Sequence, residues 1–214
     1  MACCSAYAHT FNHRVAALDL ARYRKFGPSR ATKVMLELVQ RACSPQGKQV
    51  LDIGAGVGAA HLELLKAGAA SAIDVDGSQA YLEAARSEAQ RLGFVERVTY
   101  RYADFVEVAS EIPEVDLVLL DRAICCYPDM PALVGAASQK ARCAMGLVWP
   151  RESRWVRLGV ALFNLFERVF VPCPLMVYVH PSAQVDVVAA QQGLGLYAHR
   201  AVGFWQVRAY ARTL

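Results

Sequence analysis

The sequence predicts an α/β fold of three layers, in which a seven-stranded, mostly parallel sheet ends in an antiparallel hairpin. Between residue 48 and about residue 150, short apolar runs typical of buried strands alternate with segments of helical periodicity. This alternation favours a parallel sheet with right-handed crossovers. The last two strand-like runs, 194–202 and 204–212, meet at Gly203 through a connection short enough for an antiparallel hairpin.

Each element of this fold has its own sequence signal. The strands expected before the hairpin cover 48–54, 71–76, 97–104, 115–121 and 144–149. The expected helices cover 30–42, 58–68, 78–92, 130–142 and 182–192, and the first of them follows Pro28 with Ser29 as its N-cap. We interpret residues 1–214 as one domain. It would comprise an N-terminal helical lid region (1–42), a ligand-binding core (43–150), a helical cap (151–180), and a last helix with the closing strands (181–214).

The composition excludes several classes of protein. Charged residues make up 20% of the chain, and its net charge of +4 is spread along the sequence, so we expect no nucleic-acid partner. No apolar stretch reaches the roughly 18 to 20 residues that span a bilayer, and the first residues lack the apolar run of a secretion signal. We therefore expect a cytoplasmic protein without stable membrane insertion.

The cysteines give no metal-binding pattern. There are seven of them, an odd count, and the sequence contains neither a CxxC pair nor histidines at zinc-finger spacing. We expect reduced thiols and no metal site.

The turn within "VLDIGAGVGAA" (50–60) is the main functional signal, and two nucleotide cofactors could occupy it. Its glycines would let a ligand approach backbone N–H groups at a helix N-terminus. For a nicotinamide cofactor, Gly54, Gly56 and Ala59 satisfy the dinucleotide pattern, and Asp74 lies near the expected distance for a ribose contact. Against it, Asp52 lies inside the strand, a third glycine follows at 58, and a whole helix precedes the strand.

With these features the sequence resembles the class I S-adenosylmethionine-dependent methyltransferases, whose Rossmann-like fold has the same closing hairpin. The resemblance implies S-adenosyl-L-methionine as the cofactor; an NAD(P)-dependent oxidoreductase is the alternative. The residues that it places at the cofactor are Asp52, Gly54, Gly56 and Gly58 around the methionine part, Asp74 with Val75 at the ribose, Asp104 with Phe105 at the adenine, and Asp121 with Arg122 at the mouth. Tyr23 is expected either in a lid over the cofactor or on an ordinary helix face.

A narrower likeness concerns a group of small bacterial proteins. The segments "DLARYRKFGP", "LDRAICCYPDM", "WPR", "YVHP" and "FWQVRAYAR" look like those of methyltransferases grouped with the magnesium-protoporphyrin O-methyltransferases. This likeness does not transfer the porphyrin substrate, because the cap is shorter than a macrocycle site requires.

The chemistry of methyl transfer limits which residues can act. An in-line displacement depends largely on positioning, and a base within hydrogen-bond reach helps when the acceptor carries a proton. The candidates for the base are Asp121, Tyr127 and His180, followed by Tyr23, His9 and His13. Packing explains Tyr127 equally well, and His180 could simply cap the following helix.

The acceptor is expected to be a small, partly apolar molecule. The segment 151–170 is amphipathic, with arginines along one helical stripe, and we interpret it as a cap over the acceptor; a membrane-surface helix or a homodimer contact is the alternative. Cys125 and Cys126 could indicate a thiol or arsenic substrate, but buried small hydrophobes are more common. The fourth-strand segment "DRAICC" lacks the signature of methylases acting on bases or protein glutamines. A non-catalytic binding module is a third hypothesis.

Overall fold

The computed structural model describes residues 9–212 and contains the expected seven-stranded sheet. The strands are β1 (Gln49–Ile53), β2 (Ser71–Asp76), β3 (Val98–Tyr102), β4 (Val115–Asp121), β5 (Ala141–Pro150), β6 (Leu194–Val202) and β7 (Trp205–Arg212). Their order is β3-β2-β1-β4-β5-β7-β6, and β7 pairs antiparallel with both β5 and β6. The predicted fold class and its closing hairpin are confirmed.

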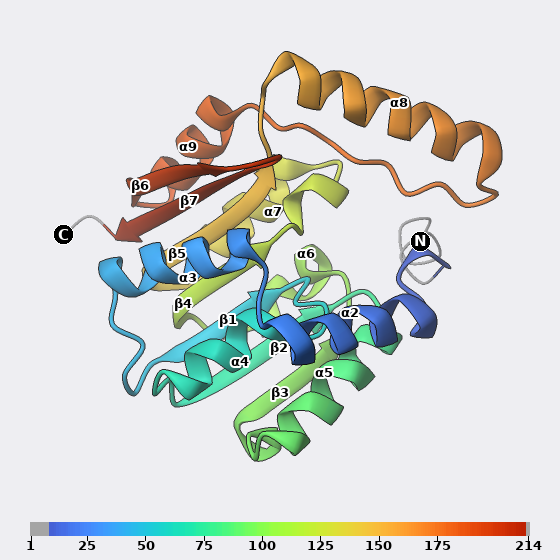
Figure 1. Ribbon diagram of the computed structural model, residues 1–214. Helices are drawn as coiled ribbons and strands as arrows, with labels where there is room; N and C mark the ends of the chain where they lie inside the picture. The colour runs from blue at the N-terminus through green and yellow to red at the C-terminus, as the bar shows by residue number, and fades with distance from the viewer. Residues whose placement is uncertain (1–8, 213–214) are drawn as a thin grey trace.

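Helices cover both faces of the sheet and form the three layers (Figure 1). The helices are α2 (His13–Phe26), α3 (Arg30–Ala42), α4 (Ala59–Lys66), α5 (Gln79–Arg91), α6 (Phe105–Val108), α7 (Met130–Lys140), α8 (Arg154–Phe170) and α9 (Ser182–Gln191). Helices α3, α4 and α5 share one apolar core with α2, whereas α6, α7 and α9 contribute to a second core on the opposite face. Serine side chains cap several N-termini; Ser29, for example, accepts a hydrogen bond from the Thr32 amide.

The register of β1 and β2 determines which residues reach the carboxyl edge of the sheet. Asp52 pairs with Asp74 and Ile53 with Val75. The Gly54 amide then donates to the Val75 carbonyl at 2.8 Å, so the chain leaves β1 beside the end of β2. Asp76 is the last residue of β2. Polar groups after parallel strands meet at this edge, where ligands of α/β folds commonly bind.

Helix α8 lies apart from the layers and is connected to the domain by the segment that follows it (Figure 1). The Asn164 amide donates to the Val177 carbonyl at 2.8 Å and accepts from the Val177 amide at 2.9 Å. Val160 alone is buried among the residues of α8. No helix of the described chain has the length and apolarity needed to cross a membrane.

The expectation of reduced cysteines is wrong for one pair. Cys43 and Cys143 form a disulfide, although 100 positions separate them in the sequence. Cys43 ends α3 and Cys143 lies in β5, and α3 packs against that strand, so only the tertiary fold brings the thiols together. Cys125 is a buried free thiol, and Cys3 and Cys4 lie outside the described residues. Residues 9–212 contain no cluster of three or more potential metal ligands.

We expect the Cys43–Cys143 disulfide to contribute to stability, because a cross-link over a long loop lowers the entropy of the unfolded chain. Cys43→Ala should lower the free energy of unfolding by about 2 to 5 kcal/mol. Denaturant unfolding with and without dithiothreitol measures this loss, and Cys143→Ala and the double variant should match the single variant. An identical unfolding midpoint for the wild-type chain under both conditions would show that the thiols are not joined.

Candidate functional site

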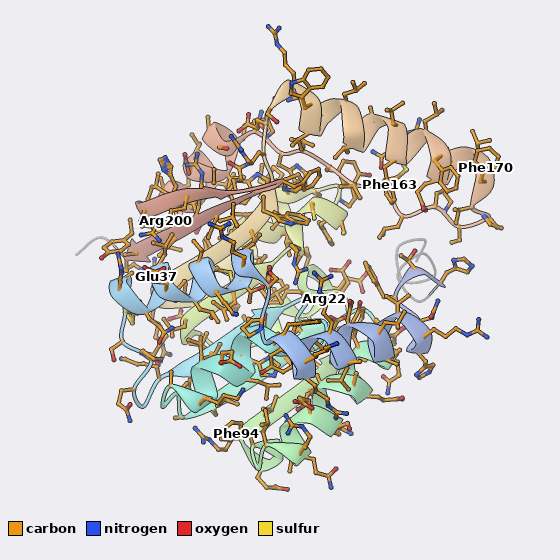
Figure 2. The ribbon with its side chains drawn as sticks, in the orientation of Figure 1. Arg22, Glu37, Phe94, Phe163, Phe170 and Arg200 are labelled. Carbon is orange, nitrogen blue, oxygen red and sulfur yellow. A yellow bond between two sulfur atoms is a disulfide. The ribbon has the colours of Figure 1, made fainter. Side chains whose placement is uncertain are left out.

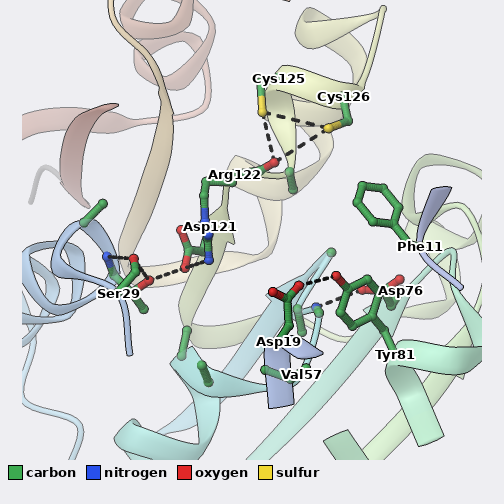
Figure 3. A pocket seen from close by; sticks show the side chains of 18 of the residues that line it. Phe11, Asp19, Ser29, Val57, Asp76, Tyr81, Asp121, Arg122, Cys125 and Cys126 are labelled. Atoms are coloured by element: carbon green, nitrogen blue, oxygen red, sulfur yellow. Dashed lines mark hydrogen bonds and ion pairs between the residues drawn. The ribbon is translucent and has the colours of Figure 1, made fainter. Parts of the chain in front are cut away.

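A cavity of about 1430 Å³ opens at the carboxyl edge of the sheet. It is larger than the roughly 300 to 1,000 Å³ of common small-molecule sites. Its walls come from the ends of β1, β2 and β4, the junction of α2 and α3, α8 with its following segment, and the β6–β7 turn. Figure 3 shows part of this wall in close view. The volume gives room for a nucleotide-sized ligand and a second, smaller molecule.

The glycine turn forms the floor of the cavity. Gly54 and Gly56 both line it and have φ angles of 65° and 59°, in the left-handed region. A Cβ atom on Gly54 would lie 2.9 Å from the Cβ of Ala123, and one on Gly56 would contact the Tyr81 ring. Gly58, which does not line the cavity, has a different role. It is the left-handed N-cap of α4, and a Cβ there would lie 2.7 Å from the His61 ring.

Asp76 is the carboxylate that β2 presents to the cavity. Its two oxygens accept hydrogen bonds from the Gly56 amide at 2.9 Å and the Ser78 amide at 2.7 Å. Burial raises the pKa of Asp76 to about 6, although these two amides favour the ionised form. Sequence reasoning missed this residue because it took the first acid in "SAIDVD" for the functional one.

The structure places Asp74, the residue expected at the ribose, outside the cavity wall. Asp74 is completely buried, does not line the cavity, and both of its oxygens lack a hydrogen-bond partner. Burial, with Asp52 and then Asp76 as further contributors, raises its pKa well above the ordinary range. The position along the strand is the physical reason. Asp74 and Asp76 point to the same face of β2, but Asp74 lies two residues inside the strand, opposite Asp52, whereas Asp76 ends the strand at the cavity.

Asp52 is likewise an interior residue and not part of the cavity wall. It is fully buried, and its Oδ2 lies 2.9 Å from Nδ1 of His61 and accepts from the His61 amide at 3.2 Å. The carboxylate therefore fixes the first turn of α4 against the end of β1. Asp52 was expected to contact the methionine part of a cofactor, but its side chain does not reach the cavity. It supports the glycine turn only indirectly, through α4.

Asp104 and Phe105 line the cavity, as does Val75. Asp104 is the N-cap of α6, where it accepts from the Val106 amide at 2.9 Å. It also accepts from the Tyr127 hydroxyl at 3.1 and 3.2 Å. Tyr127 thus lines the cavity, and its hydroxyl is hydrogen-bonded to Asp104. Its expected role as a base stays a prediction.

Asp121 and Arg122, which were expected at the mouth of the site, both line the cavity. Their side chains are hydrogen-bonded at 3.1 and 3.2 Å, and Asp121 also accepts from the Thr32 hydroxyl at 2.6 Å. Figure 3 shows this network continuing to Ser29. Arg122 has a φ of 63°, a conformation that non-glycine residues rarely adopt and that often occurs at functional sites.

His180 is a structural residue and does not line the cavity. Its Nε2 lies 2.8 Å from the Ile124 carbonyl and 3.1 Å from the Tyr127 carbonyl. Because carbonyls only accept, this nitrogen must carry a proton and donate it. Burial lowers the pKa of His180. The imidazole holds the turn after β4 from outside the cavity wall. Its expected role as the base for the acceptor stays a prediction that this position does not favour.

Of the candidate bases near the N-terminus, one lies in the cavity wall and the others lie outside it. The Tyr23 ring lines the cavity, while its hydroxyl donates to Glu63 at 2.8 Å and is therefore directed toward α4. His9 and His13 do not line the cavity; His13 lies 3.7 Å from Glu83 at the surface. Sequence reasoning did not identify a second pair, in which the Tyr81 hydroxyl donates to Asp19 at 2.5 Å (Figure 3). No motif indicates it, because α2 and α5 meet only in the folded chain.

The outer end of the cavity is apolar. Phe26 at the end of α2, Phe163 of α8 and Phe204 at the β6–β7 turn all line it, although they are 63%, 44% and 41% exposed. Leu175 and Val177, from the segment after α8, line it too. Figure 2 shows Phe163 on the side of α8 that faces the domain. Three elements that are distant in the sequence therefore form one aromatic rim.

Comparisons with known proteins agree with this arrangement. A family profile described as a methyltransferase domain matches residues 50–143, which include the glycine turn and the ends of β2 and β4. No curated protein matches the sequence at the significance required.

Solved structures share the fold over most of the chain. The structure of magnesium protoporphyrin IX methyltransferase from Synechocystis PCC 6803 with bound SAH has a TM-score of 0.75 at 17% identity, covering 99% of this chain and 100% of that one. An O-methyltransferase family protein from Burkholderia thailandensis has a TM-score of 0.70 at 17% identity, covering 93% and 58%. A putative sarcosine dimethylglycine methyltransferase from Galdieria sulphuraria has 0.70 at 12%, covering 86% of each chain. None of these findings supports the oxidoreductase alternative.

We expect Asp76→Asn to weaken the binding of S-adenosylhomocysteine by at least about tenfold, since a charged acceptor for ribose hydroxyls is worth roughly 1 to 3 kcal/mol. Asp74→Asn is the matched control on the same strand. It should leave the affinity within about threefold, because it replaces a buried carboxyl that has a raised pKa and no contact with the cavity. Calorimetry measures both. A loss of S-adenosylhomocysteine affinity confined to the Asp74 variant would return the ribose contact to Asp74.

Binding should also depend on pH. If ribose hydroxyls donate to the ionised Asp76, protonation competes with the ligand, so affinity falls below the pKa of about 6. The dissociation constant at pH 5 should be about tenfold higher than at pH 8. Titrations of wild type across this range test the expectation, with Asp76→Asn giving a flat profile. An equally flat wild-type profile would contradict it.

Proposed function

Because this chain is a class I S-adenosylmethionine-dependent methyltransferase, we propose that it methylates a small, partly apolar molecule held between the cofactor site and the aromatic rim. The observation that supports this substrate class is the rim itself, with Phe26, Phe163 and Phe204 around the open end of the cavity. An apolar pocket with few polar groups favours ligands of matching character. The ion pair of Asp121 with Arg122, which lines the cavity, would orient a polar substituent.

The residues around the inner cavity fit S-adenosyl-L-methionine. Gly54 and Gly56 line the cavity in left-handed conformations and let a ligand approach the backbone, and Asp76 presents a carboxylate at the strand end. We assign the methionine part to this glycine turn, the ribose to Asp76 and the adenine to the wall that contains Asp104 and Phe105. When bound, the cofactor supplies an electrophilic methyl group on a sulfonium.

The remaining task of the protein is to position the acceptor and accept its proton. Thr32 is completely buried and donates to Asp121, so the carboxylate is held in one orientation. We assign Asp121 as the base for a hydroxyl or protonated amine, and Arg122 as the group that orients the acceptor. Residues 151–180 would serve as the cap, with Phe163 and Leu175 excluding water from the apolar end.

We also propose a cytoplasmic location in a bacterium and an acceptor that is not a nucleic acid. The motifs shared with a small bacterial group support the first part, and the spread of the positive charge supports the second. The Cys43–Cys143 disulfide is the observation against this location, since cytosolic thiols are usually kept reduced. The response of that pair to reductant therefore also bears on the location.

A screen for released S-adenosylhomocysteine tests the proposed acceptor class. Apolar aromatic hydroxyl and carboxyl compounds should be methylated, whereas size-matched polar compounds, RNA and protein should not. Phe163→Asp should raise the KM for an active acceptor by at least about tenfold, since one large apolar contact is worth roughly 1 to 3 kcal/mol. Leu165→Asp, on the same helix but outside the cavity, should leave KM unchanged. Methylation of polar or macromolecular acceptors alone would contradict the proposal.

Asp121→Asn tests the assignment of the base. We expect it to lower kcat by about 10² to 10⁴-fold, because it removes the proton acceptor, with S-adenosylhomocysteine affinity within about threefold of wild type. The pH–rate profile should lose its acidic limb. Thr32→Ser, which keeps the hydroxyl, serves as the control and should retain most activity. Full turnover in the Asp121 variant would mean that positioning alone accounts for catalysis.

A further inference from the structure

The outer face of α8 is the largest feature that the proposed activity does not use. The apolar side chains of this face recur at helical spacing and are 51% to 82% exposed; they are Trp155, Leu158, Leu162, Leu165, Phe166 and Val169. Nothing in the described part of the chain covers them. A contiguous exposed apolar surface of this kind marks an interaction site on most soluble domains.

The orientation of this face is fixed by the inner side of the helix. Asn164 makes two hydrogen bonds with the backbone of Val177, and Glu167 accepts from the Leu175 amide at 3.3 Å. Val160 is buried on the same inner side. The helix therefore cannot rotate its outer apolar face toward the domain without breaking these contacts.

Arginines lie along one flank of the apolar face. At 100° per residue, Arg154, Arg157 and Arg168 are grouped within about a sixth of the helix circumference, beside the apolar face. All three are exposed. Arg157 lies 3.5 Å from Glu152, whereas no ion pair involves Arg154 or Arg168 in the described chain. The carboxylate of Glu167 is used on the inner side. The exposed flank is therefore positively charged.

We propose that α8 binds the surface of an anionic lipid bilayer, with its apolar face in the headgroup region and its arginines at lipid phosphates. An amphipathic helix with a wide apolar face, a terminal tryptophan and a basic flank has the character of an interfacial helix. A second copy of the chain fits less well. A two-fold antiparallel pairing of this face would bring the two arginine rows together, at a cost from like-charge repulsion.

The same helix connects this surface to the cavity. Phe163 lines the cavity, whereas Leu162 and Phe166 belong to the outer face. Docking would therefore place the aromatic rim close to the lipid interface, where an apolar acceptor would be concentrated. This last step rests on the proposed function, but the binding of α8 to lipid does not.

Co-sedimentation with vesicles tests the proposal without any acceptor. The full chain should bind vesicles of phosphatidylcholine with phosphatidylglycerol, more weakly at high salt, and the emission of the exposed Trp155 should shift to shorter wavelength. Leu162→Glu with Phe166→Glu should lower the partition coefficient more than about tenfold. Leu196→Glu with Val187→Glu, at exposed apolar positions elsewhere, is the matched control and should bind like wild type.

The charge and the fold are tested separately. Arg154→Gln and Arg168→Gln should each weaken binding to the anionic vesicles by roughly fivefold, with little change for pure phosphatidylcholine. S-adenosylhomocysteine affinity equal to that of wild type would show that the α8 variants are folded. A wild-type chain that binds vesicles but not S-adenosylhomocysteine would contradict the proposed function and still support lipid binding by α8. Equal vesicle binding by the Leu162/Phe166 variant and wild type would overturn the proposal. So would a dimer that buries this face and does not bind vesicles.

Discussion

The hydrogen bond from the Gly56 amide to the Asp76 carboxylate joins the two strand ends on which the site depends. It connects the turn after β1 to the last residue of β2 and directs the glycine backbone toward the cavity. The parallel register, with Ile53 opposite Val75, makes the contact possible. The bond also favours the ionised carboxylate in a buried position, which opposes the effect of burial on its pKa. A hydrogen-bond acceptor is thus held beside the glycine turn that lines the cavity.

The interior layer behind this turn contains acids that serve the fold. Asp52 holds the start of α4 through His61, while Asp74 lies opposite Asp52 without any hydrogen-bond partner. A buried carboxyl without partners is costly when charged, and its raised pKa is the expected response. The two acids of β2 therefore differ in hydrogen bonding as well as in position. Of these two, only Asp76 lines the cavity.

Much of the architecture could be predicted from the sequence, because periodicity and the glycine turn are local signals. The seven-stranded, mostly parallel sheet, the closing hairpin and the cavity positions of Gly54, Gly56 and Arg122 follow from such signals. Tertiary facts could not be predicted. The choice between Asp74 and Asp76 depends on register and on where β2 ends at the edge of the sheet, because the two acids point to the same face of the strand. The disulfide depends on the packing of α3 against β5, and the role of His180 depends on carbonyls more than 50 positions away.

The acceptor side depends on the segment between β5 and α9, whose sequence signal was only its amphipathicity. In the structure this segment has two faces: Phe163 and Leu175 line the cavity, while the other face of α8 is exposed.

A crystal structure of the complex with S-adenosylhomocysteine would test the assignment of Asp76 to the ribose. We expect ribose hydroxyls within hydrogen-bond distance of the Asp76 carboxylate and the sulfur directed toward Asp121. A ligand bound away from Asp76, or a ribose in contact with Asp74, would contradict it.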